Sequence, residues 1–160
     1  ATEVGYHYSG TMIRPETWQT AWAYAHAHYY ALAWSHASRT YAWTILGNDA
    51  AVGKQGERYP TLIILKHFAN FVPPGAVLLE SAADNAKVRP LVFRLPDGSY
   101  SAIVLNENTT AQTVTFAGLD ARIAGVVTTT ETAYEVPGQT SSDGLTLTLP
   151  PTSISSLTLK

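Results

Sequence analysis

The sequence predicts an α+β fold in which two strand–helix units precede an antiparallel β-sandwich of about eight strands. Three observations lead to this prediction. All four Trp and all five His residues lie before Pro73-Pro74-Gly75. Two segments before that point repeat apolar residues at helical spacing, whereas later segments alternate apolar and polar residues like strands. Because a Pro-Pro-Gly run is typical of a sharp corner, we expect one part at residues 1–75 and a sandwich domain at residues 76–160.

Two short strands are expected in the first part. The first ends at Thr2-Glu3 and is followed by Gly5. The second covers Ser38–Leu46, which is rich in β-branched and aromatic residues and stops at Gly47-Asn48-Asp49. Each strand is followed by a helical segment, and strand–helix–strand–helix is the repeating order of parallel α/β folds. Two such units cannot close a barrel of eight strands, so we expect an incomplete TIM-type barrel.

Two helices are expected, one from Trp18 to about Trp34 and one from Thr61 to about Val72. The first helix is expected to start at Arg14-Pro15-Glu16-Thr17, with Pro in the first turn and Glu16 favourable at the positive end of the helix dipole. The second helix is apolar around most of its circumference, so other elements must cover it on several sides. We expect His67 on the surface of this helix or at an interface.

The sandwich is expected from Ala76 onward, because short alternating segments recur there about every 8–12 residues. Leu145, Leu147 and Leu149 alternate with threonines, which is typical of a half-buried strand. Pro96-Asp97-Gly98-Ser99 is a strong hairpin turn. The expected strands are 76–81, 89–95, 100–106, 112–117, 123–130, 133–135, 145–149 and 154–159.

Composition narrows the classes of function. The formal net charge is −2 and charged residues make up 14% of the chain, so nothing indicates a nucleic acid or an anionic membrane as partner. No apolar run reaches the ~18 residues that a membrane-spanning helix needs. The sequence has no Cys, which excludes disulfides and thiolate chemistry. Low charge with many Ser, Thr and Tyr residues is compatible with a secreted protein, and we expect secretion.

No metal or other cofactor is expected. His26 and His28 are two positions apart on the first helix, so their side chains point in different directions and cannot hold one ion together. The sequence contains no phosphate-binding glycine loop, dinucleotide fingerprint or Gly-x-Ser-x-Gly motif. Trp18, Trp22 and Trp34 fall in the same helix, where we expect them to pack in the core.

The order of these segments resembles the C-terminal portion of a retaining (β/α)₈-barrel glycoside hydrolase of clan A, similar to family thirty. The most specific segment is Lys66-His67-Phe68-Ala69-Asn70-Phe71-Val72-Pro73-Pro74-Gly75-Ala76, which resembles the last barrel helix leading into the sandwich. The resemblance implies hydrolysis of a β-linked polysaccharide. It also implies that Glu3 matches the nucleophile at the end of the seventh barrel strand, and that Trp43 forms the floor of the sugar site.

The remaining candidate site residues are Tyr6, His7 and Tyr8, which follow Glu3. Aromatic rings stack on sugars, and Tyr and His side chains can donate hydrogen bonds to them, so these residues either bind the substrate or pack within a loop. Retaining hydrolysis needs two carboxyl groups about 5–5.5 Å apart. The family places the acid/base in an Asn-Glu pair of the fourth strand, and Asn106-Glu107, in a sandwich turn, does not fit that role.

An incomplete barrel leaves strand edges and apolar helix faces open. We therefore expect residues 1–72 to contact another copy of the chain or a separate N-terminal barrel chain. Two functions stay open at this point. One is a glycosidase that is complete only with a partner, and the other is a non-catalytic sandwich that binds carbohydrate or stabilises a neighbouring domain. The glycan also stays open among glucan, xylan and galactan.

Overall fold

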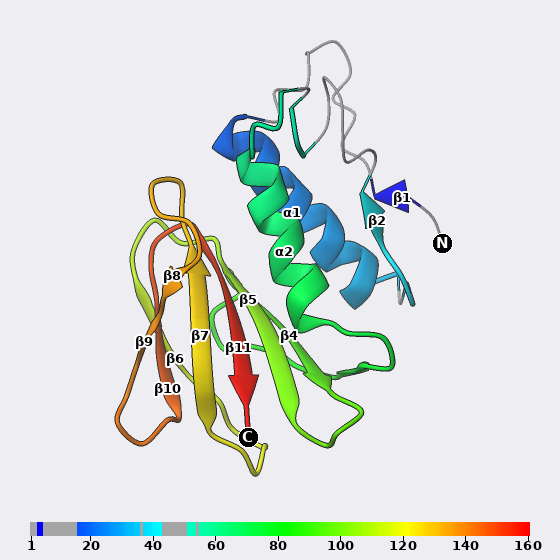
Figure 1. Ribbon diagram of the computed structural model, residues 1–160. Coiled ribbons are helices and arrows are strands. Elements are labelled where there is room, and N and C mark those ends of the chain that lie inside the picture. The colour runs from blue at the N-terminus through cyan, green and yellow to red at the C-terminus, as the bar shows by residue number, and fades with distance from the viewer. Residues whose placement is uncertain (1–2, 5–15, 36, 43–50, 54) are drawn as a thin grey trace. The chain divides into compact units, whose positions relative to one another are not determined.

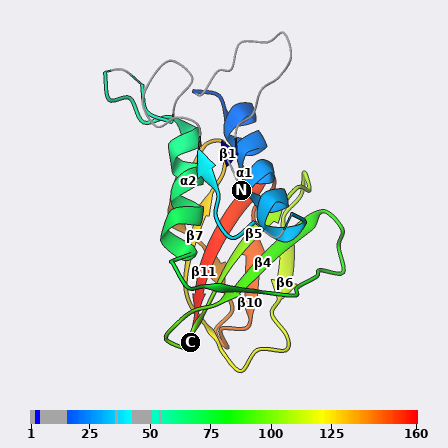
Figure 2. The same ribbon diagram turned by 90° about the vertical axis from the view of Figure 1, so that its right-hand side faces the viewer.

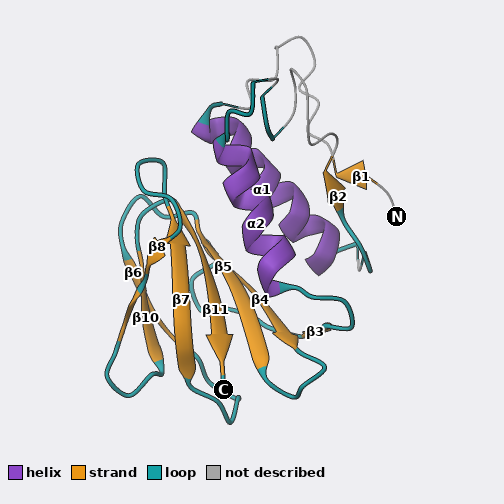
Figure 3. Ribbon diagram, in the orientation of Figure 1, coloured by secondary structure: helices purple, strands orange, loops and turns teal. Residues whose placement is uncertain are grey.

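The computed structural model describes residues 3–4, 16–35, 37–42, 51–53 and 55–160. The chain divides into two compact units, residues 1–66 and residues 67–160. The described residues form two helices and eleven strands, which Figure 3 distinguishes by colour. This is an α+β fold with a mostly antiparallel sandwich, as the sequence predicts. The expected boundary at residue 75 stays a prediction about domains.

The first unit contains helix α1 (Trp18–Ala33) and a short parallel sheet of β1 (Glu3–Val4) and β2 (Tyr41–Ala42). Glu3 pairs with Tyr41, and Val4 pairs with Ala42. Parallel strands need a crossover connection, which here contains α1. Two complete barrel units are not shown by the described residues, so the incomplete barrel stays a prediction.

Helix α1 begins after Thr17, whose side chain provides the N-cap. The Thr17 hydroxyl accepts a hydrogen bond from the backbone N–H of Thr20 at 3.3 Å. Glu16 therefore precedes the cap beside the positive end of the helix, whereas the first turn begins at Trp18, so the expectation of Pro in the first turn is wrong. The physical reason is that a threonine oxygen already satisfies one of the free N–H groups at the helix start. Trp34 is the C-cap, which agrees with the expected end of the helix.

Helix α2 (Pro60–Phe71) begins with proline, which fits the first helical position because its missing N–H would have no partner there. Its residues from His67 onward belong to the second unit. The His67 ring is buried there, with Nδ1 at 2.7 Å from Ser156 Oγ and Nε2 at 2.8 Å from Thr129 Oγ1. His67 is therefore an interface residue, one of the two places expected for it. The C-terminal end of α2 is also held by Ser101, whose hydroxyl donates to the Phe71 carbonyl.

The second unit is built from a six-stranded and a three-stranded antiparallel sheet (Figure 1). The larger sheet has the order β3-β4-β5-β11-β7-β8, so β11, the last strand in the sequence, lies in its centre between β5 and β7. Its strands are β3 (Val77–Leu79), β4 (Val88–Arg94), β5 (Tyr100–Asn106), β7 (Ile123–Thr129), β8 (Val136–Pro137) and β11 (Ser153–Leu159). The smaller sheet has the order β6-β10-β9, from β6 (Gln112–Thr115), β10 (Thr146–Leu149) and β9 (Gln139–Thr140).

The core of the second unit lies between the two sheets, whose strands can be followed in Figure 2. Strand β10 contributes Leu147 and Leu149, the inward leucines of the predicted alternation, and both are fully buried. The larger sheet covers them with inward-facing aliphatic side chains of Val88, Val92, Ala102, Val104, Leu157 and Leu159. Period-two alternation therefore sets the inner face of both sheets.

The expected strand at Ala133–Glu135 is wrong. The chain turns there instead, because the Thr130 N–H donates to the Ala133 carbonyl at 2.8 Å. Glu135 has a φ of 51°, a left-handed conformation that an extended strand cannot contain. Two strands of two residues each, β8 and β9, follow this turn and were not expected.

Candidate functional site

The predicted catalytic residue, Glu3, is the first residue of β1. Its backbone pairs with Tyr41 in the parallel neighbour β2. Tyr6, His7, Tyr8 and Trp43 lie outside the described residues. The roles of all five residues in binding or cleaving a sugar therefore stay predictions.

Aromatic side chains follow one face of α1 at a spacing of four residues, from Trp18 through Trp22, His26 and Tyr30 to Trp34. Successive ring centroids are 5.7, 5.0, 6.2 and 5.0 Å apart. Residues four apart are neighbours on a helix surface, which explains the column. Trp18 is buried, as expected. The expected core position of Trp34 is wrong, because this residue is 71% exposed at the end of the helix.

His28 connects α1 to the segment that leads into β2. Its Nδ1 lies 2.9 Å from the Thr40 hydroxyl, and the side chain is only 2% exposed. Burial lowers the pKa of His28 to about 4, because the charged imidazolium would lose its hydration. The ring is therefore neutral near pH 7, and it positions β2 against the helix as an uncharged group.

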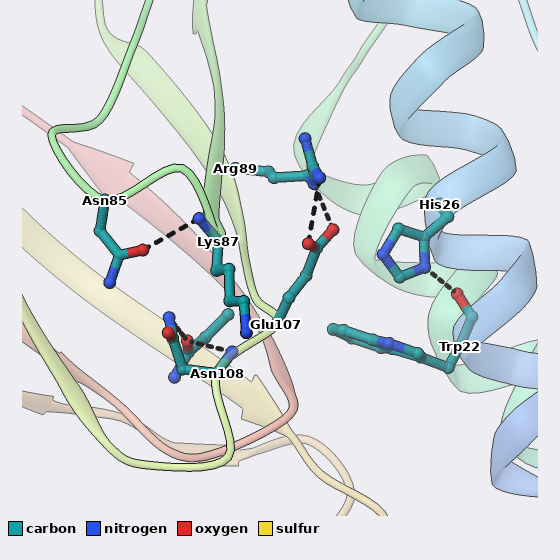
Figure 4. Close-up of polar contacts among 8 residues, drawn as sticks. Trp22, His26, Asn85, Lys87, Arg89, Glu107 and Asn108 are labelled. Carbon is teal, nitrogen blue, oxygen red and sulfur yellow. Dashed lines mark hydrogen bonds and ion pairs between the residues drawn. The ribbon is translucent and has the colours of Figure 1, made fainter.

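His26 has a different neighbour from His28, as expected for residues two positions apart. Its Nδ1–H donates to the Trp22 carbonyl at 2.9 Å (Figure 4). Within the described ranges, no three His, Asp or Glu side chains gather in a way that would hold a metal ion. Neither α1 nor α2 has the combination of length and hydropathy that crossing a bilayer requires.

Glu107 is held by Arg89 in a two-pronged ion pair, which Figure 4 shows. The Arg89 and Glu107 side chains are 25% and 19% exposed. A bidentate guanidinium–carboxylate pair occupies both carboxylate oxygens. The expectation that Asn106-Glu107 does not supply the acid/base stays a prediction.

The sandwich contains a groove of about 720 Å³ that the sequence analysis did not predict. Its walls are residues 79–85 and residues 112–119, and between them lie Val88, Pro90, Val92 and Val104. Asn85 Nδ2 donates to Gln112 Oε1 at 3.1 Å and so connects the two walls at one point. The volume lies within the range of about 300–1,000 Å³ that is typical of ligand sites.

The fold and the sequence together define the class of protein. Helix α2 ends at Phe71, and Pro73-Pro74-Gly75 connects it to a two-sheet sandwich. The model of the glycosyl hydrolase family 30 beta sandwich domain matches residues 75–157. The match covers more than half of the chain. This chain belongs to the family of glycosyl hydrolase family 30 beta sandwich domains.

Solved structures show the same fold. The catalytic domain of the family 30 xylanase C from Talaromyces cellulolyticus has a TM-score of 0.79 at 17% identity, over 100% of this chain and 38% of that chain. The family 30 subfamily 8 xylanase from Clostridium acetobutylicum has a TM-score of 0.80 at 11% identity, over 98% of this chain and 41% of that chain. This chain therefore spans about two fifths of the length of these structures. The comparison with curated proteins finds no match.

Proposed function

We propose that this chain supplies the C-terminal part of a retaining glycoside hydrolase that cleaves a β-linked polysaccharide. The observation that carries the proposal is the parallel pair of β1 and β2, with Glu3 in β1, in a chain whose sandwich belongs to family 30. The backbone of a strand in a parallel sheet is fixed by its hydrogen bonds to the neighbouring strand. A carboxylate on such a strand therefore has a defined position, which a nucleophile needs to reach one carbon atom.

In the proposed reaction, the Glu3 carboxylate attacks the anomeric carbon and the glycosidic C–O bond breaks. A second carboxyl group protonates the leaving oxygen and then removes a proton from the water that releases the sugar from Glu3. That second group comes from outside residues 1–160. Trp43 forms the floor of the sugar site, and Tyr6, His7 and Tyr8 bind the sugar beside it.

The acid/base is proposed to lie on barrel strands outside residues 1–160. Residues 1–72 are proposed to contact a polypeptide that carries those strands, or another copy of the chain. Xylan is the first substrate to test, because the two solved structures named above are described as xylanases. Secretion is also proposed. It is supported by the low charge of the chain and by a TM-score of 0.72 to a structure described as a conserved exported protein from Bacteroides fragilis, at 15% identity.

A Glu3→Gln substitution tests the proposal in protein that also contains the other barrel strands. We expect the substitution to lower kcat on xylan by about 10³-fold or more, because removal of a covalent nucleophile abolishes the two-step route. Binding of the glycan should persist, since the amide keeps the shape of the side chain. A 2-deoxy-2-fluoroglycoside should leave a covalent label on the peptide that contains Glu3, measured by mass spectrometry.

The matched control is Glu131→Gln, because Glu131 is an exposed carboxylate of the sandwich and should not affect kcat. A label on a different carboxylate, or full activity of the Glu3→Gln variant, would show that the assignment of Glu3 is wrong.

A non-catalytic sandwich that binds carbohydrate or stabilises a barrel is the second candidate. It is favoured by the extent of the family match, which is confined to residues 75–157 and so covers the sandwich alone. This function predicts no hydrolysis by the unaltered protein in the same assay, together with glycan binding or a higher unfolding temperature of the barrel.

A further inference from the structure

Helix α1 is connected to the sheet of the first unit by a hydrogen bond that involves a buried histidine. The ring of His28, in the second half of α1, is 2% exposed, and its Nδ1 lies 2.9 Å from the hydroxyl oxygen of Thr40. Thr40 directly precedes β2. The two residues are twelve positions apart in the sequence, so this bond fixes the place where the chain returns from the helix to the sheet.

Strand β2 connects Thr40 to the residues of the proposed reaction. The backbone of Tyr41 pairs with that of Glu3 in β1. Trp43, the expected floor of the sugar site, follows Ala42 directly in the sequence. Each described strand of this sheet has two residues, and so short a ladder is marginal by itself. A shift of β2 would therefore move the backbone of Glu3 and of the residue that precedes Trp43.

The packing around His28 favours one position of its ring. Tyr24, one turn earlier in α1, is 3% exposed, and its ring centroid lies 6.4 Å from that of His28. Close packing leaves buried rings little freedom to change rotamer. A packed ring can therefore hold Thr40 at a defined point, which a long and exposed side chain cannot do without a large loss of conformational entropy.

We propose that His28 is a positioning residue of the hydrolase, because its hydrogen bond to Thr40 sets the place of β2 and so the place of Glu3 relative to the sugar. The inference rests on the proposed function, since it concerns the step in which Glu3 attacks the anomeric carbon. His28 neither touches the sugar nor exchanges a proton with it. A displacement of about 1 Å can lower the rate of such a step about 10²-fold, so a contact distant from the reacting atoms can affect it.

A role of His28 in stability alone makes a different prediction. Loss of stability lowers the fraction of folded molecules, whereas each folded molecule keeps its full rate. Misplacement of Glu3 lowers the rate of each folded molecule. Titration with a 2-deoxy-2-fluoroglycoside, which should label Glu3 covalently, counts the active molecules and so separates the two effects.

The test uses Thr40→Val in protein that also contains the other barrel strands. Valine keeps the shape of threonine but has no hydroxyl group, so it cannot form the hydrogen bond to His28. We expect kcat/KM on xylan, per labelled molecule, to fall about tenfold or more. The rate of labelling by the fluoroglycoside should fall by a similar factor, because both quantities require attack by Glu3. The matched control is Thr40→Ser, which keeps the hydroxyl and should retain kcat/KM within about twofold.

Two variants of the histidine test the other side of the bond. In His28→Asn the side-chain amide can take the place of Nδ1 and still bond to Thr40, whereas His28→Leu has no hydrogen-bonding group. We expect kcat/KM per labelled molecule to be at least about tenfold higher in His28→Asn than in His28→Leu. The difference should disappear when each is combined with Thr40→Val, because the partner hydroxyl is then absent. Circular dichroism and the unfolding midpoint verify that the variants fold.

Two results would overturn this inference alone. One is an unchanged kcat/KM per labelled molecule in Thr40→Val. The other is independent, multiplicative effects of His28→Leu and Thr40→Val, which would show that the two side chains do not act through their common bond. Failure of the proposed function is distinguishable from both. In that case the unaltered protein does not hydrolyse xylan, or the label lies on a carboxylate other than Glu3, and the role of His28 is overturned together with it.

Discussion

His28 is a neutral side chain in a helix that is otherwise rich in aromatic and small residues. It is almost fully buried and has a hydroxyl group, Thr40 Oγ1, at hydrogen-bond distance. A neutral imidazole can donate from one nitrogen and accept at the other, which suits such a position. The imidazolium cannot accept a hydrogen bond, and its charge would be poorly hydrated there. Protonation of this one ring should therefore weaken the first unit.

The stability of the first unit should depend on pH through His28. The pKa is lowered from 6.5 to about 4 in the folded protein, so the unfolded chain binds more protons between these values. The unfolding free energy should be highest above pH 6.5 and fall by ~3 kcal/mol as the pH decreases to about 4. Urea unfolding, followed by fluorescence, measures this difference because every Trp residue lies before residue 67.

The control for this prediction is a comparison of His28→Gln with His26→Gln. His28→Gln should remove most of the slope between pH 6.5 and 4, whereas His26→Gln, a half-buried position on the same helix, should keep it. An unchanged slope in the His28→Gln protein would contradict the assignment.

At the scale of elements, Asn106 at the end of β5 joins two loops of the sandwich. Its Nδ2 donates to the carbonyls of Thr110, Leu149 and Pro150 at 3.2, 3.3 and 2.7 Å. Its Oδ1 accepts hydrogen bonds from the N–H and the side-chain amide of Asn108 at 3.0 and 2.8 Å. The side chain is completely buried, and it provides the hydrogen bonds that water would otherwise make with the backbone groups of both loops.

An Asn106→Ala substitution should lower the unfolding free energy of the second unit by about 2–3 kcal/mol. The reason is that several backbone groups would lose their partner in a buried place. Urea unfolding followed by circular dichroism near 215 nm measures the loss. The matched control is Asn108→Ala, which removes one side-chain bond and keeps the backbone N–H, and it should cost less than about 1 kcal/mol. Equal losses would show that Asn106 is no more important than its neighbour.

Elements with a strong periodic pattern could be predicted from the sequence. Strand β5 has the predicted bounds, and β10 contains the buried leucines of the predicted alternation. The turn around Glu135 could not be predicted, because nothing in the sequence there demands a left-handed residue. Strands β8 and β9 have only two residues each, which is too short for a period of two to be recognised.

Of the two candidate sites, Glu3 could be predicted from the sequence and the groove beside β6 could not. The role predicted for Glu3 rests on the resemblance of the whole chain to a family, since one glutamate near Gly5 carries no pattern of its own. The groove beside β6 could not be predicted, because its walls come from residues 79–85 and 112–119. Whether those segments enclose space depends on how many strands each sheet contains, which is a property of the folded sandwich.

At the scale of the whole molecule, the first unit should associate with another polypeptide. Its parallel sheet has only two described strands, whereas parallel sheets are normally covered on both faces. Trp34 and Tyr41 are 71% and 51% exposed. Light scattering at high concentration should therefore give a mass above the 17.3 kDa of one chain. Alternatively, the chain should bind a polypeptide that carries the other barrel strands.

Replacement of Trp34 by Ser should weaken this association, because it removes the most exposed large apolar side chain among the described residues. Replacement of Tyr134, an exposed aromatic of the second unit, is the control and should leave the association unchanged. A folded chain that is monomeric at every concentration and ignores the barrel polypeptide would show that the first unit needs no partner.

The central place of β11 in the larger sheet has a consequence for synthesis on the ribosome. Among the described strands, β5 and β7 are joined only through Ser153–Leu159, which the ribosome makes after the other described strands. At about 5–20 residues per second, the nascent chain carries two separate half-sheets for seconds before they can unite. A stop codon at Ser153 would therefore remove the middle of the sheet rather than its margin, and the truncated product should be degraded by proteases instead of accumulating.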